Sequence, residues 1–191
     1  MEIYQFFHKN LRITNDNLIK NLEKKSSLEM IKRKSLLFQK DEFQKEIYFL
    51  FNGFFRTFYY DENGREITEY FECESGQMLV TNSVIENESV FYIQAIIDSV
   101  VLKIENDSFL DFMKEYPEFS KIYNNVLIES LKKHWKLKEI RCRLNAEKRY
   151  EWFLSEYAIL NKYVKDKDIA SFLGMNPVTL SKIKNSKNFI K

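Results

Sequence analysis

The sequence predicts an α+β fold in three parts: an antiparallel β jelly-roll barrel over residues 1–117, a long helix over 118–144 and a small helical domain over 145–191. Three observations predict it. Short aromatic and β-branched segments recur in the first part, with turn residues between them. A stretch without Gly or Pro follows, and the chain ends in two short helical segments around a Gly. Many short strands at this spacing favour an antiparallel barrel over a parallel sheet.

The first part contains six segments with strand composition, preceded by a helix expected at residues 15–24. The segments are SLLFQ (35–39), EIYFLF (46–51), FFRTFYY (54–60), REITEYF (65–71), VFYIQAII (90–97) and VVLKIE (100–105). Residues 61–64, Asp-Glu-Asn-Gly, predict a hairpin because Asn-Gly tolerates the positive φ of a tight turn. Asn52 and Gly53 mark a second turn, and a helix over residues 108–116 should end before Pro117.

The long helix carries a heptad-like face with alternating four- and three-residue spacing: Tyr123, Leu127, Ser130, His134, Leu137, Arg141 and Leu144, broadened by Leu131 and Trp135. Such a partly apolar stripe either packs on its own barrel or pairs with a second copy of the chain. We expect a homodimer, with an interface formed by Tyr123, Leu127, Leu131, His134, Leu137 and Leu144.

The third part begins with a helix over residues 146–160, with apolar side chains at helical spacing. The stretch DIASFLGMNPVTLSKIK (168–184) then reads as two short helices. Asp166 can cap the first, and Gly174 accepts the left-handed conformation that ends it. Asn176 and Pro177 open the second helix.

The spacing of small, glycine and apolar residues in this stretch fills every position of a helix-turn-helix unit. In such units the N-terminal part of the second helix enters the major groove of DNA. Thr179 suits phosphate contact, Lys182 can reach a guanine edge or a phosphate, and Val178 a thymine methyl group. The candidate DNA-binding residues are Asn176, Val178, Thr179, Ser181, Lys182 and Asn185.

Charge is distributed unevenly along the chain. Residues 121–191 contain 16 Lys/Arg against 7 Asp/Glu, a net charge of +9, whereas residues 1–120 have a net charge of −7. A basic C-terminal part is typical of a segment that contacts nucleic acid, although lysine-rich helix surfaces are also common. Double-stranded DNA is therefore the expected partner.

The sequence excludes several other classes of protein. No apolar run approaches the ~20 residues that span a bilayer, and the N-terminus lacks an export signal, so we expect a cytoplasmic protein. Cys73 and Cys142 have no metal-ligand spacing and are interpreted as two buried, reduced thiols. His8 and His134 are interpreted as surface or helix-face residues, and we expect neither a metal nor another cofactor.

Catalysis is not expected. A jelly-roll metalloenzyme needs two or three barrel histidines, and no His lies between residues 9 and 133. Gly-rich phosphate loops and the GxSxG motif are also missing. The alternative from another class is a dimeric small-molecule sensor, or a protein-interaction module, whose helix-turn-helix does not bind DNA.

The arrangement of barrel, long helix and terminal helix-turn-helix resembles the Crp/Fnr family of transcription regulators. Residues 47–71 resemble the strand–Gly–strand–hairpin core of the family's cyclic-nucleotide-binding-like barrel. AEKRYEWFLSEY (146–157) and KDIASFLGMNPVTLSKIK (167–184) resemble the start of its DNA-binding domain. The resemblance implies a homodimer formed along the long helix, a near-palindromic operator, and a barrel in which a small-molecule effector of unknown identity could bind.

The chain departs from the family at both functional sites. The family's recognition helix commonly opens Ser-Arg-Glu-Thr, whereas this one opens Asn-Pro-Val-Thr at residues 176–179, and Lys182 stands where the family has an Arg. The usual operator therefore does not carry over. Residues 72–97 contain neither the family's Phe-Gly-Glu opening nor any Arg or Lys, and Glu86 and Glu88 would repel a phosphate. We expect no binding of cyclic AMP.

Overall fold

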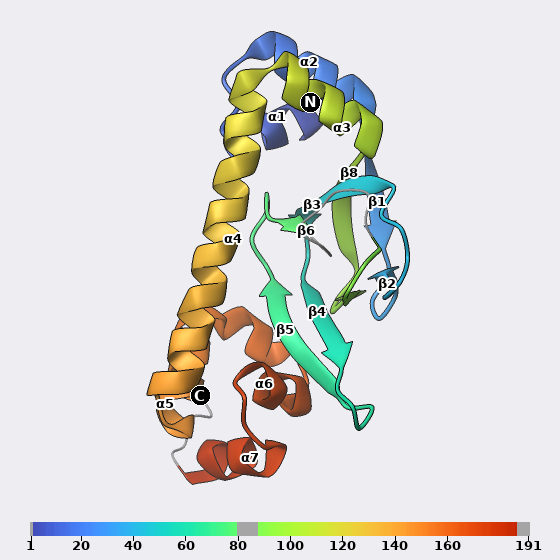
Figure 1. The fold of residues 1–191 in the computed structure, drawn as a ribbon. Coiled ribbons are helices and arrows are strands. Elements are labelled where there is room, and N and C mark those ends of the chain that lie inside the picture. The colour runs from blue at the N-terminus through green and yellow to red at the C-terminus, as the bar shows by residue number, and fades with distance from the viewer. Residues whose placement is uncertain (1, 80–87, 187–191) are drawn as a thin grey trace. The chain divides into compact units, whose positions relative to one another are not determined.

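The computed structural model describes residues 2–79 and 88–186 (Figure 1). Its contacts divide the chain into two compact units. The barrel unit comprises Met1–Thr57 and Phe71–Glu129, and the helical unit comprises Phe58–Tyr70 and Ser130–Lys191. The boundary between the units falls within the long helix, and the tip of one hairpin belongs to the helical unit.

Two four-stranded sheets form the β part, in the orders β1-β8-β3-β6 and β2-β7-β4-β5. The pairs β1–β8, β3–β8, β3–β6 and β2–β7 are antiparallel, and the α+β class with antiparallel sheets is confirmed. Strands β1 and β6 were not expected from the sequence. The strands are β1 (Ser26–Ile31), β2 (Leu36–Phe38), β3 (Glu46–Asn52), β4 (Phe55–Tyr60), β5 (Glu66–Glu72), β6 (Met78–Leu79), β7 (Tyr92–Ala95) and β8 (Ser99–Glu105).

Strand β3 is apolar on both faces because both faces are buried. Ile47 and Phe49 belong to one core cluster, whereas Tyr48 and Leu50 belong to another. Successive side chains of a strand point to opposite faces, so the uninterrupted apolar run in β3 serves two cores. On β8, Leu102 and Val101 divide in the same way.

Four helices contribute to the barrel unit: α1 (Glu2–Lys9), α2 (Asp16–Lys25), α3 (Asn106–Glu115) and the first part of α4 (Pro117–Arg143). Helix α1 was not expected, whereas α2 was, and the Asn15 side chain caps α2 by accepting from the Leu18 amide at 3.1 Å.

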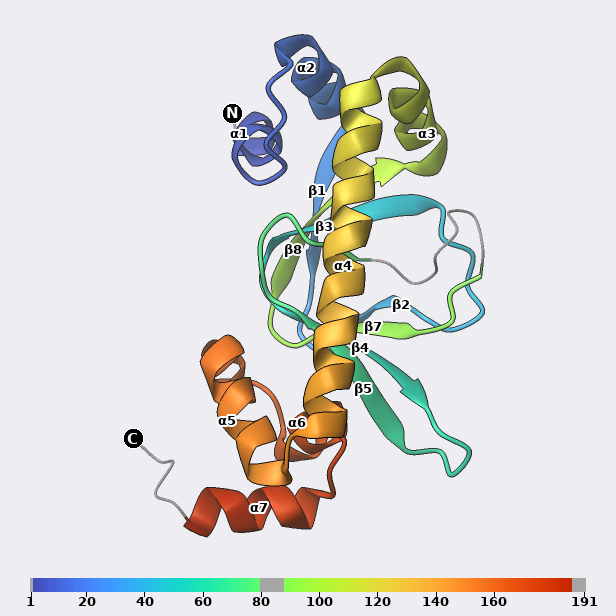
Figure 2. The ribbon, with the colours of Figure 1, turned by 60° about the vertical axis from the view of Figure 1, so that its left-hand side comes forward.

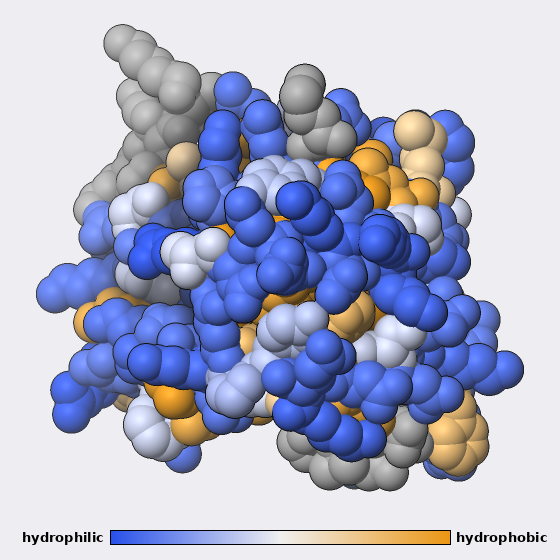
Figure 3. Space-filling model, turned by 90° about the horizontal axis from the view of Figure 1, so that it is seen from above, coloured by the Kyte–Doolittle hydropathy of each residue, from blue (hydrophilic) through white to orange (hydrophobic). Residues whose placement is uncertain are grey.

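The face seen in Figure 3 is mainly hydrophilic, with smaller apolar areas between the polar side chains. Over the part of the chain that the structure describes, no helix combines the length and hydropathy required to span a bilayer.

Both turns expected from glycine-containing pairs are present. Gly53 has φ +115°, and a Cβ there would lie 2.2 Å from the Ser99 hydroxyl oxygen, so only glycine fits. In the hairpin between β4 and β5, the Asp61 carboxylate accepts from the amides of Asn63 (2.8 Å) and Arg65 (2.9 Å). Gly64 supplies the left-handed residue of that hairpin, with φ +73°.

The helical unit contains the second part of α4 and four further segments: α5 (Ala146–Glu156), the 3₁₀ helix η1 (Ala158–Lys162), α6 (Asp166–Phe172) and α7 (Pro177–Ser186) (Figure 2). The single helix expected over 146–160 is thus two segments. Asn145 caps α5 by accepting from the Lys148 amide at 2.9 Å. Cys142 is exposed on α4 and Cys73 is half-buried, so the expectation of two buried thiols was wrong.

Candidate nucleic-acid interface

An aromatic core holds the three C-terminal helices together. Phe172 of α6 is buried against Trp152, Phe153 and Tyr157, with ring centroids 5.5–6.2 Å apart. The two helices of the pair bury further residues against this core: Ile169, Ala170, Leu173 and Leu180. The expected inward face of the helix-turn-helix is therefore present, and its opposite side is left available for a ligand.

The turn between α6 and α7 is a Schellman motif. Gly174 has φ +61°, its amide donates to Ser171 O at 3.0 Å, and the Met175 amide donates to Ala170 O at 2.9 Å. The sequence predicted this role for Gly174 correctly. The motif fixes the direction in which α7 leaves α6.

Two arginine side chains donate hydrogen bonds to the carbonyl oxygens at the C-terminal end of α6. Arg141 Nε donates to Phe172 O at 2.8 Å, and Arg149 Nη1 donates to Leu173 O at 2.7 Å and to Gly174 O at 3.0 Å. The carbonyl end of a helix carries partial negative charge, so guanidinium groups are favourable there in addition to their hydrogen bonds. Both arginines precede the helix-turn-helix stretch in the sequence, so its local spacing does not indicate their role.

Helix α7 begins as the sequence indicated. The Asn176 side-chain oxygen accepts from the Val178 amide at 2.8 Å, and Pro177 is the first helical residue. At α6 the expectation differs from the structure, because Asp166 is the first residue of the helix rather than its cap. The capping position is held by Lys165, whose side chain makes no capping hydrogen bond, and the Asp166 carboxylate pairs with Lys184 instead.

The candidate DNA-binding residues lie together on α7 and its N-cap. Five are exposed, namely Asn176, Val178, Ser181, Lys182 and Asn185, and Thr179 is half-buried. Val178, the apolar residue of this set, is 62% exposed. The exposed set combines an apolar side chain, hydroxyl and amide groups and a cation, which are the groups that read base edges and phosphates in a groove.

The two lysines of α7 have different environments. Lys182 is exposed, whereas Lys184 lies against its own unit, 2.5 Å from the Asp166 carboxylate and 5.6 Å from the centre of the Tyr150 ring. Burial raises the pKa of the Tyr150 hydroxyl, and the neighbouring Lys184 partly opposes that shift. Lys184 thus ties α7 to the start of α6 and to α5, and Lys182 is the cation on the outward side.

The predicted dimer face of α4 is largely covered by the chain itself. Tyr123 and Leu127 pack against the core of the barrel unit, and Leu137 is only 4% exposed. His134 contacts Tyr70 and Glu69, and Leu144 is half-buried. Of the six residues, Leu131 is the exposed one, at 48%. Of the stripe that the sequence predicts as a dimer interface, one residue is thus exposed, one is buried and four are half-buried.

A different face of α4 is exposed, here called the outer face: Leu131, Trp135, Lys138 and Cys142. Their spacing alternates four, three and four residues, as in a coiled-coil seam. Trp135 is 61% exposed, and it lines a shallow hollow together with Lys138, Glu139, Cys142 and Arg143. In the sequence the signal for this face is Trp135, although the heptad spacing places it at the edge of the other stripe.

The barrel unit contains a buried cation that was not expected from the sequence. Arg56 of β4 is 5% exposed, and its Nη2 donates to the Gln94 side chain of β7 at 3.4 Å. Two acidic residues were expected to repel a phosphate. Glu88 is exposed and forms an isolated antiparallel β-bridge with Phe43, whereas Glu86 lies outside the described residues. No group of three or more potential metal ligands occurs within residues 2–79 and 88–186.

Together these features define a chain with an antiparallel β domain, a long connecting helix and a C-terminal helix-turn-helix. Residues 28–116 match the cyclic nucleotide-binding domain family. No curated protein sequence matches the chain. Solved structures do, and the three described next each have a TM-score of 0.75.

FixK2 from Bradyrhizobium japonicum is 16% identical, covering 85% of this chain and 84% of its own. CLP from Xanthomonas campestris, a c-di-GMP-responsive global regulator, is 10% identical over 91% and 92% of the two chains. A protein from Eubacterium rectale assigned to the Crp/Fnr transcriptional regulators is 18% identical over 95% and 86%. The chain therefore has the Crp/Fnr regulator fold, as the resemblance in its sequence predicted.

Replacing Lys184 with Met should lower the free energy of unfolding by about 1 kcal/mol, because it removes a partly shielded ion pair and a cation–π contact. Urea titration followed by circular dichroism measures this. The matched control is Lys182→Met, which removes the same charge from the outward side of the same helix and should leave stability unchanged. Equal losses in the two variants would contradict the inward assignment of Lys184.

Proposed function

We propose that the protein is a DNA-binding transcription regulator that binds a near-palindromic operator as a homodimer. In each subunit the N-terminal part of α7 enters the major groove, and the side of the helix that carries Val178, Ser181, Lys182 and Asn185 faces the bases and backbone. Thr179, at the start of α7, contacts phosphate through its hydroxyl group. The observation that carries the proposal is the exposed polar and cationic side of α7, held outward by a helix-turn-helix with a buried core.

Charge and fold both support this function. The net charge of +9 over residues 121–191 would favour contact with the phosphate backbone. The Crp/Fnr regulator fold is the fold of proteins described as transcription regulators. The residues proposed to contact bases differ from those of the family, because Asn-Pro-Val-Thr at 176–179 lacks the Arg and Glu of the family's common opening. We therefore expect a different operator.

The outer face of α4 is the surface through which we propose that two subunits pair. A parallel pairing along Leu131, Trp135, Lys138 and Cys142 would cover Trp135, a residue type that often contributes strongly to binding at interfaces. Such a dimer would present two α7 helices about 34 Å apart, one turn of DNA, to two half-sites. We place the interface on this face because Leu137, in the middle of the other stripe, is buried, whereas Trp135 is exposed.

An effector in the barrel remains part of the proposal, and its chemistry differs from that of cyclic AMP. Residues 72–97 contain no Lys or Arg, so the segment offers no cation to a cyclic phosphate. The one buried arginine described above, Arg56, comes from β4 and is engaged with Gln94. The relative CLP is c-di-GMP-responsive, so a protein of this fold can respond to a ligand other than cyclic AMP.

DNA binding is tested first by selection from a pool of random duplexes with the purified full chain. Sequencing of the selected duplexes should reveal a palindrome. The affinity of the protein for this palindrome should fall steeply between about 50 and 200 mM salt, because counterions are released from phosphates on binding. Lys182→Ala and Thr179→Ala should each weaken binding by about 1–3 kcal/mol. No selected sequence and no gel shift at either salt would instead indicate an interaction module.

Pairing along the outer face is tested by exchanging Trp135 for Glu, which should dissociate the dimer in analytical ultracentrifugation because a charge would replace the large apolar group at the seam. The control is Lys136→Glu, a charge change on the same helix outside the seam spacing. Mild oxidation should also cross-link subunits through Cys142, because facing seam positions bring Cα atoms within disulfide range. Cross-linking should disappear in Cys142→Ser and persist in Cys73→Ser.

A Trp135→Glu protein that still sediments as a dimer would place the interface elsewhere.

Isothermal titration calorimetry with cyclic AMP should detect no binding, because the barrel segment 72–97 lacks a cation for the phosphate. The same titration with cyclic di-GMP serves as a comparison with a ligand to which a protein of this fold responds. Micromolar affinity for cyclic AMP would overturn the expectation.

A further inference from the structure

The tip of the β4–β5 hairpin, residues Phe58–Tyr70, belongs by its contacts to the helical unit rather than to the barrel unit. Its strands nevertheless continue into residues 55–57 and 71–72 of the barrel unit. The chain passes between the two units at residues 57/58, 70/71 and 129/130. Two of these three covalent connections are thus the two legs of this hairpin, and the third is α4.

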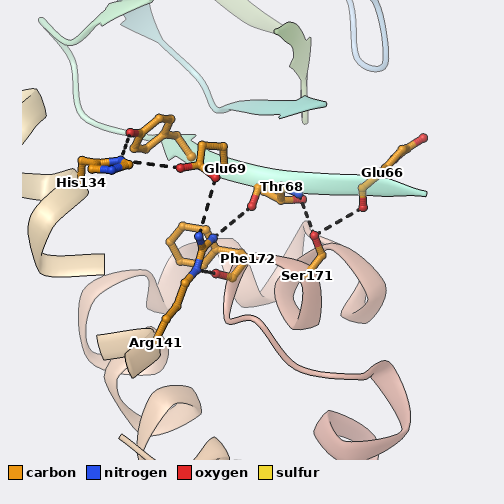
Figure 4. Close-up of polar contacts among 8 residues, drawn as sticks. Glu66, Thr68, Glu69, His134, Arg141, Ser171 and Phe172 are labelled. Atoms are coloured by element: carbon orange, nitrogen blue, oxygen red, sulfur yellow. Dashed lines mark hydrogen bonds and ion pairs between the residues drawn. The ribbon is translucent and has the colours of Figure 1, made fainter. Parts of the chain in front are cut away.

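The hairpin is bonded directly to the first helix of the helix-turn-helix (Figure 4). The Thr68 amide donates to the Ser171 hydroxyl oxygen of α6 at 2.7 Å, and that hydroxyl donates to Glu66 O at 3.4 Å. Lys167 Nζ, also on α6, lies 3.6 Å from the Glu66 carboxylate. Ser171 therefore serves the hairpin as both donor and acceptor, a pairing that a residue without a hydroxyl cannot reproduce.

Arg141 joins three elements at one guanidinium group. From its position on α4, it donates to Phe172 O of α6 at 2.8 Å and to Thr68 O of the hairpin at 3.3 Å. Its Nη1 also lies 3.7 Å from the Glu69 carboxylate. The planar fork of arginine makes these contacts simultaneously, which the single ammonium group of a lysine does not.

Two further side chains fasten the hairpin to α4. The Tyr70 hydroxyl lies 2.5 Å from His134 Nδ1, and the Glu69 carboxylate lies 3.6 Å from the same nitrogen. The hairpin is thus bonded to α6 on one side and to α4 on the other. The bonds of Thr68 to Ser171 and Arg141 lie at the same end of α6 that Arg141 and Arg149 cap, where the turn into α7 begins.

We propose that the hairpin Phe58–Tyr70 is a clamp on α6, and that Ser171 and Arg141 are positioning residues that set the placement of α7 for DNA. This inference rests on the proposed function. Neither residue needs to touch DNA: each acts on α7 through the end of α6. Because the legs of the clamp continue into barrel strands, a rearrangement of those strands would reach the helix-turn-helix through the hairpin as well as through α4.

The first arm of the test measures the clamp without DNA. Hydrogen–deuterium exchange of the full chain, followed by mass spectrometry, reports on peptides covering residues 58–70. Ser171→Ala removes the acceptor of the Thr68 amide and should speed exchange of that amide by about fivefold or more. Ser171→Thr keeps the hydroxyl and should restore slow exchange. The control is Ser155→Ala, because Ser155 bonds only locally, to Trp152 O, in the described contacts.

The second arm measures DNA affinity on the selected duplex and on duplexes with one base pair added or removed between half-sites. Ser171→Ala should weaken binding about fivefold and flatten the preference for one spacing, while Ser171→Thr should bind as the parent does. Arg141→Lys should behave like Ser171→Ala. Its matched control is Arg143→Lys, which makes the same exchange two residues away, where the side chain is exposed and pairs with Glu139 on its own helix.

The outcomes separate the clamp from the proposed function. Faster hairpin exchange together with weaker, less spacing-selective DNA binding supports the inference. Unchanged exchange in Ser171→Ala, or faster exchange with unchanged affinity and spacing, overturns it. If the parent protein selects no DNA, the proposed function fails and the positioning role fails with it, while the exchange arm still decides whether the hairpin is held. Circular dichroism melting of each variant shows that a loss of affinity does not come from unfolding.

Discussion

The carbonyl end of α6 is the constraint on which the helix-turn-helix depends. A helix of seven residues is too short to be stable in isolation, so its position must come from packing and from bonds at its ends. Here the Schellman turn at Gly174 and the guanidinium groups of Arg141 and Arg149 satisfy the last carbonyls. The direction of α7 follows from this arrangement, because α7 starts three residues after the turn glycine.

The same arrangement separates the two sides of α7. On the inner side, Leu180 is buried and Lys184 pairs with Asp166 over the Tyr150 ring. On the outer side, Val178, Ser181 and Lys182 are exposed. Two lysines only two residues apart thus have different environments, and a count of positive charge along the helix would not distinguish them.

The fold depends on buried residues, whereas the proposed DNA specificity depends on exposed ones. A regulator fold can be kept at 10–18% sequence identity because buried apolar positions accept many combinations of similar volume. Specificity for a DNA sequence depends on a few exposed side chains and changes when they change. This chain keeps the fold, whereas the residues at 176–179 and 182 differ from the family's common pattern.

The sequence by itself determined the features that depend on near neighbours along the chain. These include the Asn-Gly hairpin, the Asn145 cap, the left-handed Gly174 and the Asn176–Pro177 start of α7. Each results from bonds or backbone preferences within about five residues, which the local sequence encodes directly. The apolar periodicity likewise indicated the antiparallel strands and the long helix, although it missed α1, β1 and β6.

Only the tertiary structure decided which side of each helix is free. The Arg141–Phe172 bond joins residues 31 positions apart, and the Thr68–Ser171 bond joins residues 103 positions apart. Such partners leave no periodic signal in the sequence. The sequence therefore does not indicate that Leu137, in the middle of the predicted stripe, is buried, or that Trp135, at its edge, is exposed. Periodicity identifies an apolar face, but the rest of the folded chain determines whether that face is already covered.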